Sequence, residues 1–331
     1  MAGTVRVGVA GVGSLGFHHA RILREIPGVE LVGIHDIDPE RLAEVSATLG
    51  AAAFGELYPL LDAVDALVVA VPTTAHEEVA CAALERGVHV LVEKPIAPTL
   101  EAADRILDTA ASTGALVQIG HVERFNGALR ACEPYLDEPL FIESHRLAPF
   151  GTRGTDVAVV LDLMIHDLDL VLSLASRRVT SIAAVGVPVL TASPDIANAR
   201  IEFEGGGVAN LTASRVSMER KRKIRFFQRS GYISLDLAAG VGEFLRLRPG
   251  IVFEPGVPLA APSLEAVIER IPLQGDGREP LRCELESFVD AVAGRAPVAV
   301  SGQDGRRALA VALEIVERIE QHVAHSSSAR A

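Results

Sequence analysis

The stretch Val-Arg-Val-Gly-Val-Ala-Gly-Val-Gly-Ser-Leu-Gly, residues 5–16, decides the fold of the first part of the chain. Residues 5–10 form a short apolar run typical of a buried strand, and residues 14–25 are helix-like. Between them, Gly11, Gly13 and Gly16 give the pattern Gly-x-Gly-x-x-Gly. The first glycine permits a tight turn, the second lets the backbone approach a pyrophosphate, and the third allows the helix to pack closely on the strand. We therefore expect a phosphate-binding turn, to which the helix N-terminus adds N–H donors.

An acidic residue follows this turn at a characteristic distance. Asp36 lies 20 residues after Gly16 (36 − 16), where it can accept hydrogen bonds from a ribose diol. Asp36 could instead cap a helix, but Asp38 fills that role better because it directly precedes a proline. An acid at position 36, followed by Ile37 and without a nearby arginine, disfavours a 2′-phosphate. We therefore expect NAD as the cofactor rather than NADP.

The first 120 residues alternate between short apolar runs and longer amphipathic segments. Strands are predicted at 5–10, 30–35, 65–71, 89–92 and 116–120, and helices near 14–25, 39–49, 75–86 and 100–112. This alternation is typical of a doubly wound parallel sheet covered on both faces. The residues expected to contact the cofactor lie where its strands end: Gly11, Val12, Gly13, Ser14, Leu15, Gly16, Asp36, Ile37, Val71, Pro72, Glu93 and Lys94.

The pattern then changes to a series of strands separated by turns. A strand at 140–147 and a helix at 156–174 precede strands at 179–189, 199–204, 208–214, 222–229, 232–237 and 243–248. The glycines at 205–207 predict a hairpin, and the series predicts an open, mainly antiparallel sheet with helices on one face. Four apolar residues are candidates for an oligomerisation face on the other side: Leu211, Ile224, Phe226 and Ile233. Helices are also predicted at 281–293 and 305–323, before a frayed tail at 324–331.

Composition excludes several classes of function. Lys and Arg number 31 against 43 Asp and Glu, so the formal net charge is −12. This balance argues against a nucleic-acid binder, which needs clustered positive charge. The three cysteines are too few and too scattered for a disulfide framework or a zinc site. We see neither a signal-peptide pattern nor an apolar run of about 20 residues, so we expect a cytoplasmic protein without membrane insertion.

Two groups of residues are candidates for catalysis. Only three of the 31 basic residues are lysines, and one of them, Lys94, directly follows the strand predicted at 89–92. There it can donate a hydrogen bond to a reacting hydroxyl, or it can be a solvated lysine before Pro95. Asp162 and His166 are four residues apart on one face of an apolar helix. This spacing suits an aspartate that supports a histidine general base, although a buried structural histidine fits the pattern as well. We expect no metal site.

These features together resemble the Gfo/Idh/MocA oxidoreductases over nearly the whole chain. The resemblance rests on residues 11–16, Asp36, the sequence Glu-Lys-Pro at 93–95, and Asp162 followed by His166. It implies a dinucleotide-binding domain at 1–120, and a substrate-binding and oligomerisation domain at 121–304. It also implies a last helix, 305–323, that packs on the first domain, and homodimers or homotetramers formed through the antiparallel sheet. It further implies that Lys94, Asp162 and His166 are the catalytic set.

A narrower resemblance concerns residues 120–126, 143–147 and 214–217. These segments are similar to the branch of the family that oxidises the 3-hydroxyl of UDP-N-acetylglucosamine or a related UDP-sugar. In that branch the 3-keto product would be aminated by a partner aminotransferase in lipid A biosynthesis. Candidate substrate residues are Arg124, Asn126, Arg153 and Arg215, with Arg146 a further cation near the site. Two alternatives remain open, namely a dehydrogenase of a free polyol or monosaccharide, and a non-catalytic NAD-binding sensor.

Overall fold

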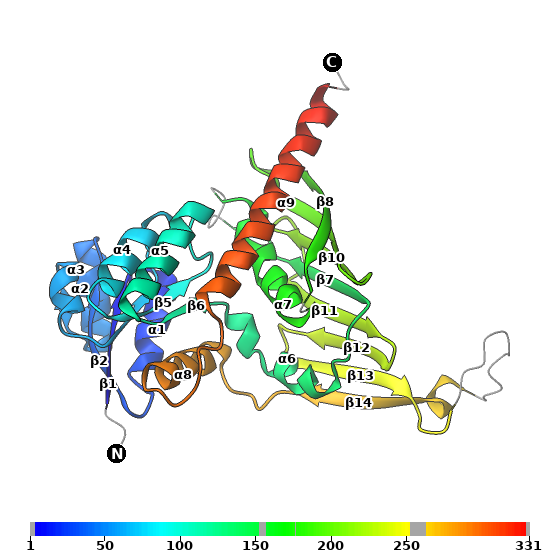
Figure 1. Cartoon of the computed structure of the whole chain (residues 1–331), viewed down its shortest axis with the longest axis horizontal. Helices are drawn as coiled ribbons and strands as arrows, with labels where there is room; N and C mark the ends of the chain where they lie inside the picture. The colour runs from blue at the N-terminus through cyan, green and yellow to red at the C-terminus, as the bar shows by residue number, and fades with distance from the viewer. Residues whose placement is uncertain (1–3, 152–156, 176, 252–262, 329–331) are drawn as a thin grey trace. The chain divides into compact units, whose positions relative to one another are not determined.

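The computed structural model describes residues 4–151, 157–175, 177–251 and 263–328, and the chain divides by its contacts into two compact units (Figure 1). The first unit contains Met1–Phe125 and Glu279–Ala310, and the second contains Asn126–Arg278 and Val311–Ala331. Residues 279–304, which we expected in the second domain, therefore belong to the first unit. The reason is helix α8 (Pro280–Val292), because its Leu285 and Phe288 are part of the core that lies under the glycine turn.

The first unit is built on a six-stranded parallel sheet with the order β3-β2-β1-β4-β5-β6. Its strands are β1 (Val5–Ala10), β2 (Val29–His35), β3 (Ala53–Phe54), β4 (Ala66–Val69), β5 (His89–Glu93) and β6 (Val117–Gly120). Its helices include α1 (Ser14–Leu23), α2 (Pro39–Leu49), α3 (Leu57–Leu61), α4 (His76–Leu84) and α5 (Leu100–Thr113). The doubly wound parallel sheet predicted from the sequence is confirmed. We missed β3 and α3, which are too short to show a period.

Helix ends in this unit follow local chemistry. The side chain of Asp38 accepts two backbone N–H bonds at the start of α2, and Thr99 accepts one at the start of α5. Gly50 and Gly114 adopt φ values of +62° and +74° where the same two helices end. These caps fix where each helix meets the sheet, and so they fix which residues lie at the carboxyl ends of the strands.

The second unit is built on an eight-stranded sheet with the order β14-β13-β12-β11-β7-β10-β9-β8. Its strands are β7 (Phe141–Leu147), β8 (Val179–Val187), β9 (Ile196–Phe203), β10 (Val208–Ser214), β11 (Lys221–Gln228), β12 (Gly231–Asp236), β13 (Val241–Leu247) and β14 (Ile268–Gln274). Among the described strands of this second sheet only β7 and β10 pair in parallel, so the mainly antiparallel prediction is confirmed. The predicted hairpin joins β9 to β10. We missed β14, an edge strand that contains Pro272.

Helices α6 (Gly127–Cys132) and α7 (Ile165–Ala175) contact one face of this sheet (Figure 1). The four residues proposed for an oligomerisation face, Leu211, Ile224, Phe226 and Ile233, are each 0% exposed within the chain itself. That prediction is wrong, because these side chains lie on the helix-covered face. Successive side chains in a strand point to opposite faces, so the neighbouring Phe227 belongs to the other side. We call this second side, which carries Phe141, Phe227 and Tyr232, the outer face.

Helix α9 (Gly302–Ser328) is the last element of the described chain. We expected this last helix to pack on the first domain over residues 305–323, but only its residues as far as Ala310 belong to the first unit, and its residues from Val311 onward belong to the second. The frayed tail expected from residue 324 is instead helical as far as Ser328, and residues 329–331 lie outside the described part. None of the described helices is long and apolar enough to cross a bilayer.

Candidate active site

The glycine turn joins the end of β1 to the start of α1. Gly11 has a φ of +83°, and a Cβ atom on it would lie 2.6 Å from the backbone of Ala70. A Cβ on Gly16 would collide with the carbonyl oxygen of Gly11. A Cβ on Gly13, by contrast, would meet no described atom within 4 Å. Gly11 and Gly16 are therefore required by packing, whereas the space above Gly13 suits close approach by a ligand.

This open space lies at the N-terminus of α1. The N-cap residue is Gly13, which makes no side-chain cap hydrogen bond, and Gly13, Ser14 and Leu15 are exposed. Backbone N–H groups at a helix N-terminus, together with the helix dipole, bind phosphate groups. The turn therefore fits the pyrophosphate of a dinucleotide.

Asp36 connects the glycine turn to the start of α2. Its Oδ2 accepts a 2.7 Å hydrogen bond from the backbone N–H of Val12, and its Oδ1 accepts a 3.0 Å bond from that of Asp38. The side chain is half-buried, and each carboxylate oxygen has further acceptor capacity. Asp36 is thus held where it can also accept bonds from ribose hydroxyls. Ile37 beside it is 90% exposed.

Arg41 also lies at this turn, which corrects the expectation that no arginine is nearby. Its Nε donates a 2.9 Å hydrogen bond to the carbonyl oxygen of Val12, and its Nη1 lies 2.7 Å from a carboxylate oxygen of Glu44. Helix α2 brings Arg41 back to the turn, and this packing could not be inferred from sequence spacing. The charge of Arg41 is paired with Glu44, so the arginine does not by itself favour a 2′-phosphate.

Glu93 and Lys94 lie at the end of β5. The Oε1 of Glu93 lies 2.7 Å from Nε2 of His19, and both side chains are buried. Its Oε2 accepts a 3.2 Å bond from the backbone N–H of Lys94. Burial would raise the pKa of Glu93, but the hydrogen bond and charge of His19 and the charge of Lys94 outweigh it and lower the pKa. An anionic carboxylate therefore lies beside Lys94.

Two further residues hold this region together. A Cβ on Gly120, at the end of β6, would lie 3.0 Å from the carboxyl group of Glu93, so a larger residue would displace the buried acid. His76 is buried, with Nδ1 3.0 Å from the carbonyl oxygen of Pro95 and Nε2 3.0 Å from that of Val71. His19 and His76 were not among the predicted site residues, although His19 follows the glycine turn by three residues in the stretch that carries the family resemblance. His76, the first residue of α4, gave no signal of its own.

The cofactor residues predicted in the first unit thus gather at one edge of one sheet. The ends of β1, β2, β4 and β5 place the glycine turn, Asp36, the Val71-Pro72 pair and the Glu93-Lys94 pair along that edge. Because β1 lies between β2 and β4, the strand order reverses at the glycine turn, and ligands of open α/β sheets bind at such a point. The donors at the turn and the acceptor at Asp36 match a dinucleotide.

The second unit contains Asp162 and His166. We expected one α-helix here, but Val160–Met164 form a π-helical turn, in which the N–H of Ile165 donates to the carbonyl oxygen of Val160. Such turns occur most often as single insertions within α-helices, frequently at functional sites. Asp162 lies in the π turn, His166 is the second residue of α7, and both are half-buried.

Arg146 contacts this segment from β7. Its guanidinium forms a bidentate pair with Asp167, with Nη2 2.7 Å from Oδ1 and Nε 3.1 Å from Oδ2, and both side chains are buried. Arg146 was considered a free cation for substrate phosphates, but this pair uses its charge inside the unit. The contact fixes the residue that follows His166.

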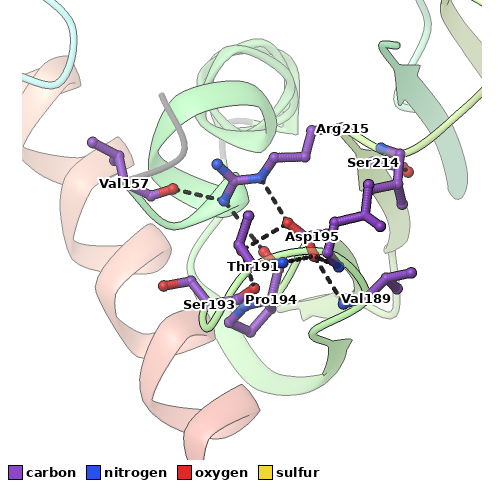
Figure 2. Close-up of polar contacts among 10 residues, drawn as sticks. Val157, Val189, Thr191, Ser193, Pro194, Asp195, Ser214 and Arg215 are labelled. Atoms are coloured by element: carbon purple, nitrogen blue, oxygen red, sulfur yellow. Dashed lines mark hydrogen bonds and ion pairs between the residues drawn. The ribbon is translucent and has the colours of Figure 1, made fainter. Parts of the chain in front are cut away.

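The substrate residues predicted from the sequence also have partners within the chain. Arg124 lies in the first unit, with Nη2 4.0 Å from a carboxylate oxygen of Asp304. Asn126 caps α6 through the N–H of Ala128 and donates a 2.9 Å bond to the carbonyl oxygen of Leu237. Arg215 is buried, and its guanidinium contacts Asp195, Val157 and Pro194 in the loops around it (Figure 2). Arg153 lies outside the described residues. Among the described residues, no three His, Cys, Asp or Glu side chains form a group that could hold a metal ion.

Comparison with known proteins places this arrangement in a family. Residues 5–121 match the model of the oxidoreductase family with an NAD-binding Rossmann fold, and residues 118–234 match the GFO/IDH/MocA C-terminal domain. The chain is 37% identical over 317 residues to UDP-N-acetylglucosamine 3-dehydrogenase of Acidithiobacillus ferrooxidans, covering 96% of this chain and 97% of that enzyme. The chain belongs to the GFO/IDH/MocA oxidoreductase family.

Solved structures and a further sequence relative agree with the assignment of this chain to the family. A structure of the Acidithiobacillus ferrooxidans enzyme superposes with a TM-score of 0.88, covering 96% of this chain and 98% of that one. Among relatives compared by sequence, inositol 2-dehydrogenase of Burkholderia ambifaria is 30% identical over an alignment of 336 positions that covers 96% of this chain and 94% of that enzyme. Scyllo-inositol dehydrogenase of Lactobacillus casei with bound NAD(H) and scyllo-inositol has a TM-score of 0.77 at 21% identity, which shows a shared fold.

Proposed function

We propose that this protein is an NAD-dependent dehydrogenase that oxidises the 3-hydroxyl of UDP-N-acetylglucosamine or a related UDP-sugar to the 3-keto sugar. The observation that carries the substrate is the 37% identity to UDP-N-acetylglucosamine 3-dehydrogenase along 96% of this chain. The reaction type is supported by the open space next to Gly13, where a Cβ would meet no described atom within 4 Å, and by Lys94 beside the buried pair of Glu93 and His19.

The proposed roles follow from the chemistry of each side chain. When bound, NAD would supply the acceptor for the hydride that leaves the sugar carbon. His166 removes the hydroxyl proton near neutral pH, and Asp162 supports the imidazolium that results. Lys94 donates a hydrogen bond to the oxygen as negative charge develops on it. Glu93 holds the backbone of Lys94, and His19 holds Glu93.

A substrate panel tests the activity. NAD reduction is followed with UDP-N-acetylglucosamine, free N-acetylglucosamine and myo-inositol. We expect turnover with the UDP-sugar.

Substitutions test the catalytic roles in the same assay. We expect His166→Ala to lower kcat by about 10²–10⁴-fold while NAD still binds. Lys94→Arg should also lose activity, because a guanidinium has neither the size nor the geometry of an ammonium. His322→Ala, at an exposed position of α9, is the matched control. Near-normal turnover of His166→Ala would refute its role as the base.

The second candidate is a dehydrogenase of a free polyol. The 30% identity to inositol 2-dehydrogenase over 96% of the chain favours it. In that case myo-inositol or a free sugar, and not the UDP-sugar, would reduce NAD in the same panel. Binding of NAD without turnover of any compound would instead favour a sensor.

NAD rather than NADP is the proposed cofactor because the carboxylate of Asp36 would repel a 2′-phosphate. We expect a kcat/KM ratio that favours NAD by about tenfold or more, and Asp36→Ala should reduce this preference. Arg41→Leu tests the arginine at the turn. If Arg41→Leu lowers the activity with NADP but not with NAD, the arginine serves a 2′-phosphate, and a wild-type kcat/KM that favours NADP would refute the cofactor proposal.

Two kinds of partner complete the proposal. A 3-keto sugar is a substrate for an aminotransferase, so we propose that such an enzyme consumes the product in lipid A type amino-sugar biosynthesis.

We also propose a homodimer or homotetramer formed through the sheet of the second unit. The outer face supports this, because it carries a cluster of aromatic rings, a residue type enriched at protein interfaces. Phe227 lies 5.4 Å from Phe141 and 4.8 Å from Tyr232, measured between ring centroids. Val185 and Val187 in β8 are 44% and 51% exposed.

A further inference from the structure

The loop between β8 and β9 folds around the carboxylate of Asp195 (Figure 2). Oδ2 of this residue accepts backbone N–H bonds from Val189, Leu190 and Thr191 at 2.8, 2.6 and 2.9 Å, and Oδ1 accepts the hydroxyl of Thr191 at 2.8 Å. Burial would raise the pKa of Asp195, but the backbone bonds outweigh it and lower the pKa to about 2. Asp195 is therefore a buried, negatively charged carboxylate near neutral pH.

Arg215 pairs with this carboxylate immediately after β10. Its backbone N–H donates to the carbonyl oxygen of Asp195 at 2.9 Å, and its Nε lies 3.5 Å from Oδ1 of the same residue. Its Nη2 donates to the carbonyl oxygens of Val157 at 2.7 Å and Pro194 at 3.3 Å. The residue is only 5% exposed. One guanidinium therefore connects the end of β10, the Asp195 loop and the segment at Val157 (Figure 2).

Val157 lies five residues before Asp162 (162 − 157) and directly before the first turn of the helical segment. The next carbonyl, that of Ala158, accepts the N–H groups of Leu161 and Asp162 at 2.9 and 3.1 Å. An anchored carbonyl at Val157 thus fixes the direction in which the π turn begins. At the other end, the pair of Arg146 and Asp167 fixes the residue after His166. The Asp162–His166 segment is held at both ends.

We propose that Arg215 is a positioning residue that, with Asp195 as its anchor, sets the π-helical turn carrying Asp162 and so aligns Asp162 and His166. This role replaces the substrate-phosphate contact expected from the sequence, since the buried guanidinium already binds a carboxylate and two carbonyl oxygens. Catalytic side chains tolerate little displacement, because a misplacement of about 1 Å can cost roughly 10²-fold in rate. The inference rests on the proposed function of Asp162 and His166.

Steady-state kinetics of Arg215→Met and Arg215→Lys test this role. For Arg215→Met we expect kcat with the UDP-sugar to fall about tenfold to a hundredfold, while KM changes less than about threefold. Arg215→Lys should recover only part of kcat, because one ammonium cannot span Asp195 and Val157 as the guanidinium does. Arg246→Met is the control, since Arg246 pairs with Glu269 between β13 and β14. A KM raised tenfold or more at unchanged kcat would show that Arg215 binds the substrate, and unchanged kinetics would overturn the proposal as well.

Hydrogen exchange of the whole protein without substrate provides a second measurement. We expect peptides covering residues 160–166 to exchange faster in Arg215→Lys and in Asp195→Asn than in wild type, with peptides of β13 unchanged. Unchanged exchange at 160–166 in both variants would overturn the proposal. This readout needs no turnover, so it separates a failure of the positioning role from a failure of the proposed activity. It also applies if Arg215→Met does not fold.

Discussion

Gly13 and Gly16 lie three positions apart in the same turn, yet their missing side chains serve different purposes. A methyl group on Gly16 would strike the carbonyl oxygen of Gly11, whereas one on Gly13 would meet no described atom within 4 Å. We expect Gly16→Ala to lower the unfolding midpoint in urea. Gly13→Ala should leave that midpoint nearly unchanged and weaken NAD binding by about tenfold or more, equivalent to about 1.4 kcal/mol. Calorimetric titration with NAD checks this, and tight binding by Gly13→Ala would contradict the assignment of the turn.

The buried Glu93 predicts an acid-dependent stability. Its pKa is lowered in the folded protein, so its contribution is present above the ordinary value of 4.5 and is lost as the pH falls below it. At pH 7 we expect Glu93→Gln to cost about 1–3 kcal/mol of unfolding free energy, because a charged hydrogen bond to His19 is replaced by a neutral one. The difference from wild type should shrink as the pH falls below 4.5 and through the lowered pKa of Glu93. Urea titrations at several pH values check this, with the exposed Glu85→Gln as control.

Individual residues differ in how far the sequence reveals them. The place of Asp36 followed from its distance of 20 residues from Gly16, because that length of chain is enough for one helix and one strand and brings Asp36 to the end of β2, beside β1. Arg41 and Arg215 could not be interpreted in this way. The contacts of Arg41 depend on how α2 packs, and those of Arg215 come from loops 21 and 58 residues away in the sequence.

At the scale of elements, β11 presents its two faces to different surroundings. Phe226 is 0% exposed on the helix-covered face, whereas Phe227 lies on the outer face. We expect Phe226→Ala to cost about 3–5 kcal/mol of unfolding free energy. Phe227→Ala should cost less than about 2 kcal/mol, because its side chain already contacts water in the single chain. Equilibrium unfolding in urea compares the two, and equal losses would show that the two faces have been assigned incorrectly.

The elements were predicted well wherever hydrophobic period and end signals agreed. Strand β1 and helix α2 have the predicted ends, because a glycine turn bounds the first and Asp38 and Gly50 bound the second. The assignment of faces in the large sheet failed, because β11 has apolar residues on both sides. The π turn was missed as well, since Val160–Met164 has the apolar pattern of an ordinary helix, and the wider turn depends on contacts at both of its ends.

At the scale of the whole molecule, the outer face predicts association. We expect the wild-type protein to be a dimer or tetramer by light scattering, and Tyr232→Glu to shift it toward monomer, because a charge would be buried among Phe141 and Phe227. Ala47→Glu, on the exposed side of α2, is the control. A wild-type monomer, or an unchanged oligomer in Tyr232→Glu with a native circular dichroism spectrum, would contradict the proposed interface.

The change of pattern near residue 120 indicated two parts to the molecule, and contacts divide the chain at Phe125 and Asn126. The return of α8 to the first unit could not be foreseen. Its apolar stripe would suit either core, and only the packing of Leu285 and Phe288 beside the glycine turn decides between them.

Pro272 interrupts one border of the large sheet. Strand β14 is the outermost strand on that side, and a proline has no N–H to offer to a strand from another molecule. Elongation of the sheet by successive addition of strands is therefore blocked along this border. In the proposed oligomer the copies would instead associate through their outer faces, and a symmetric contact of this kind closes after a few subunits instead of continuing as a fibre.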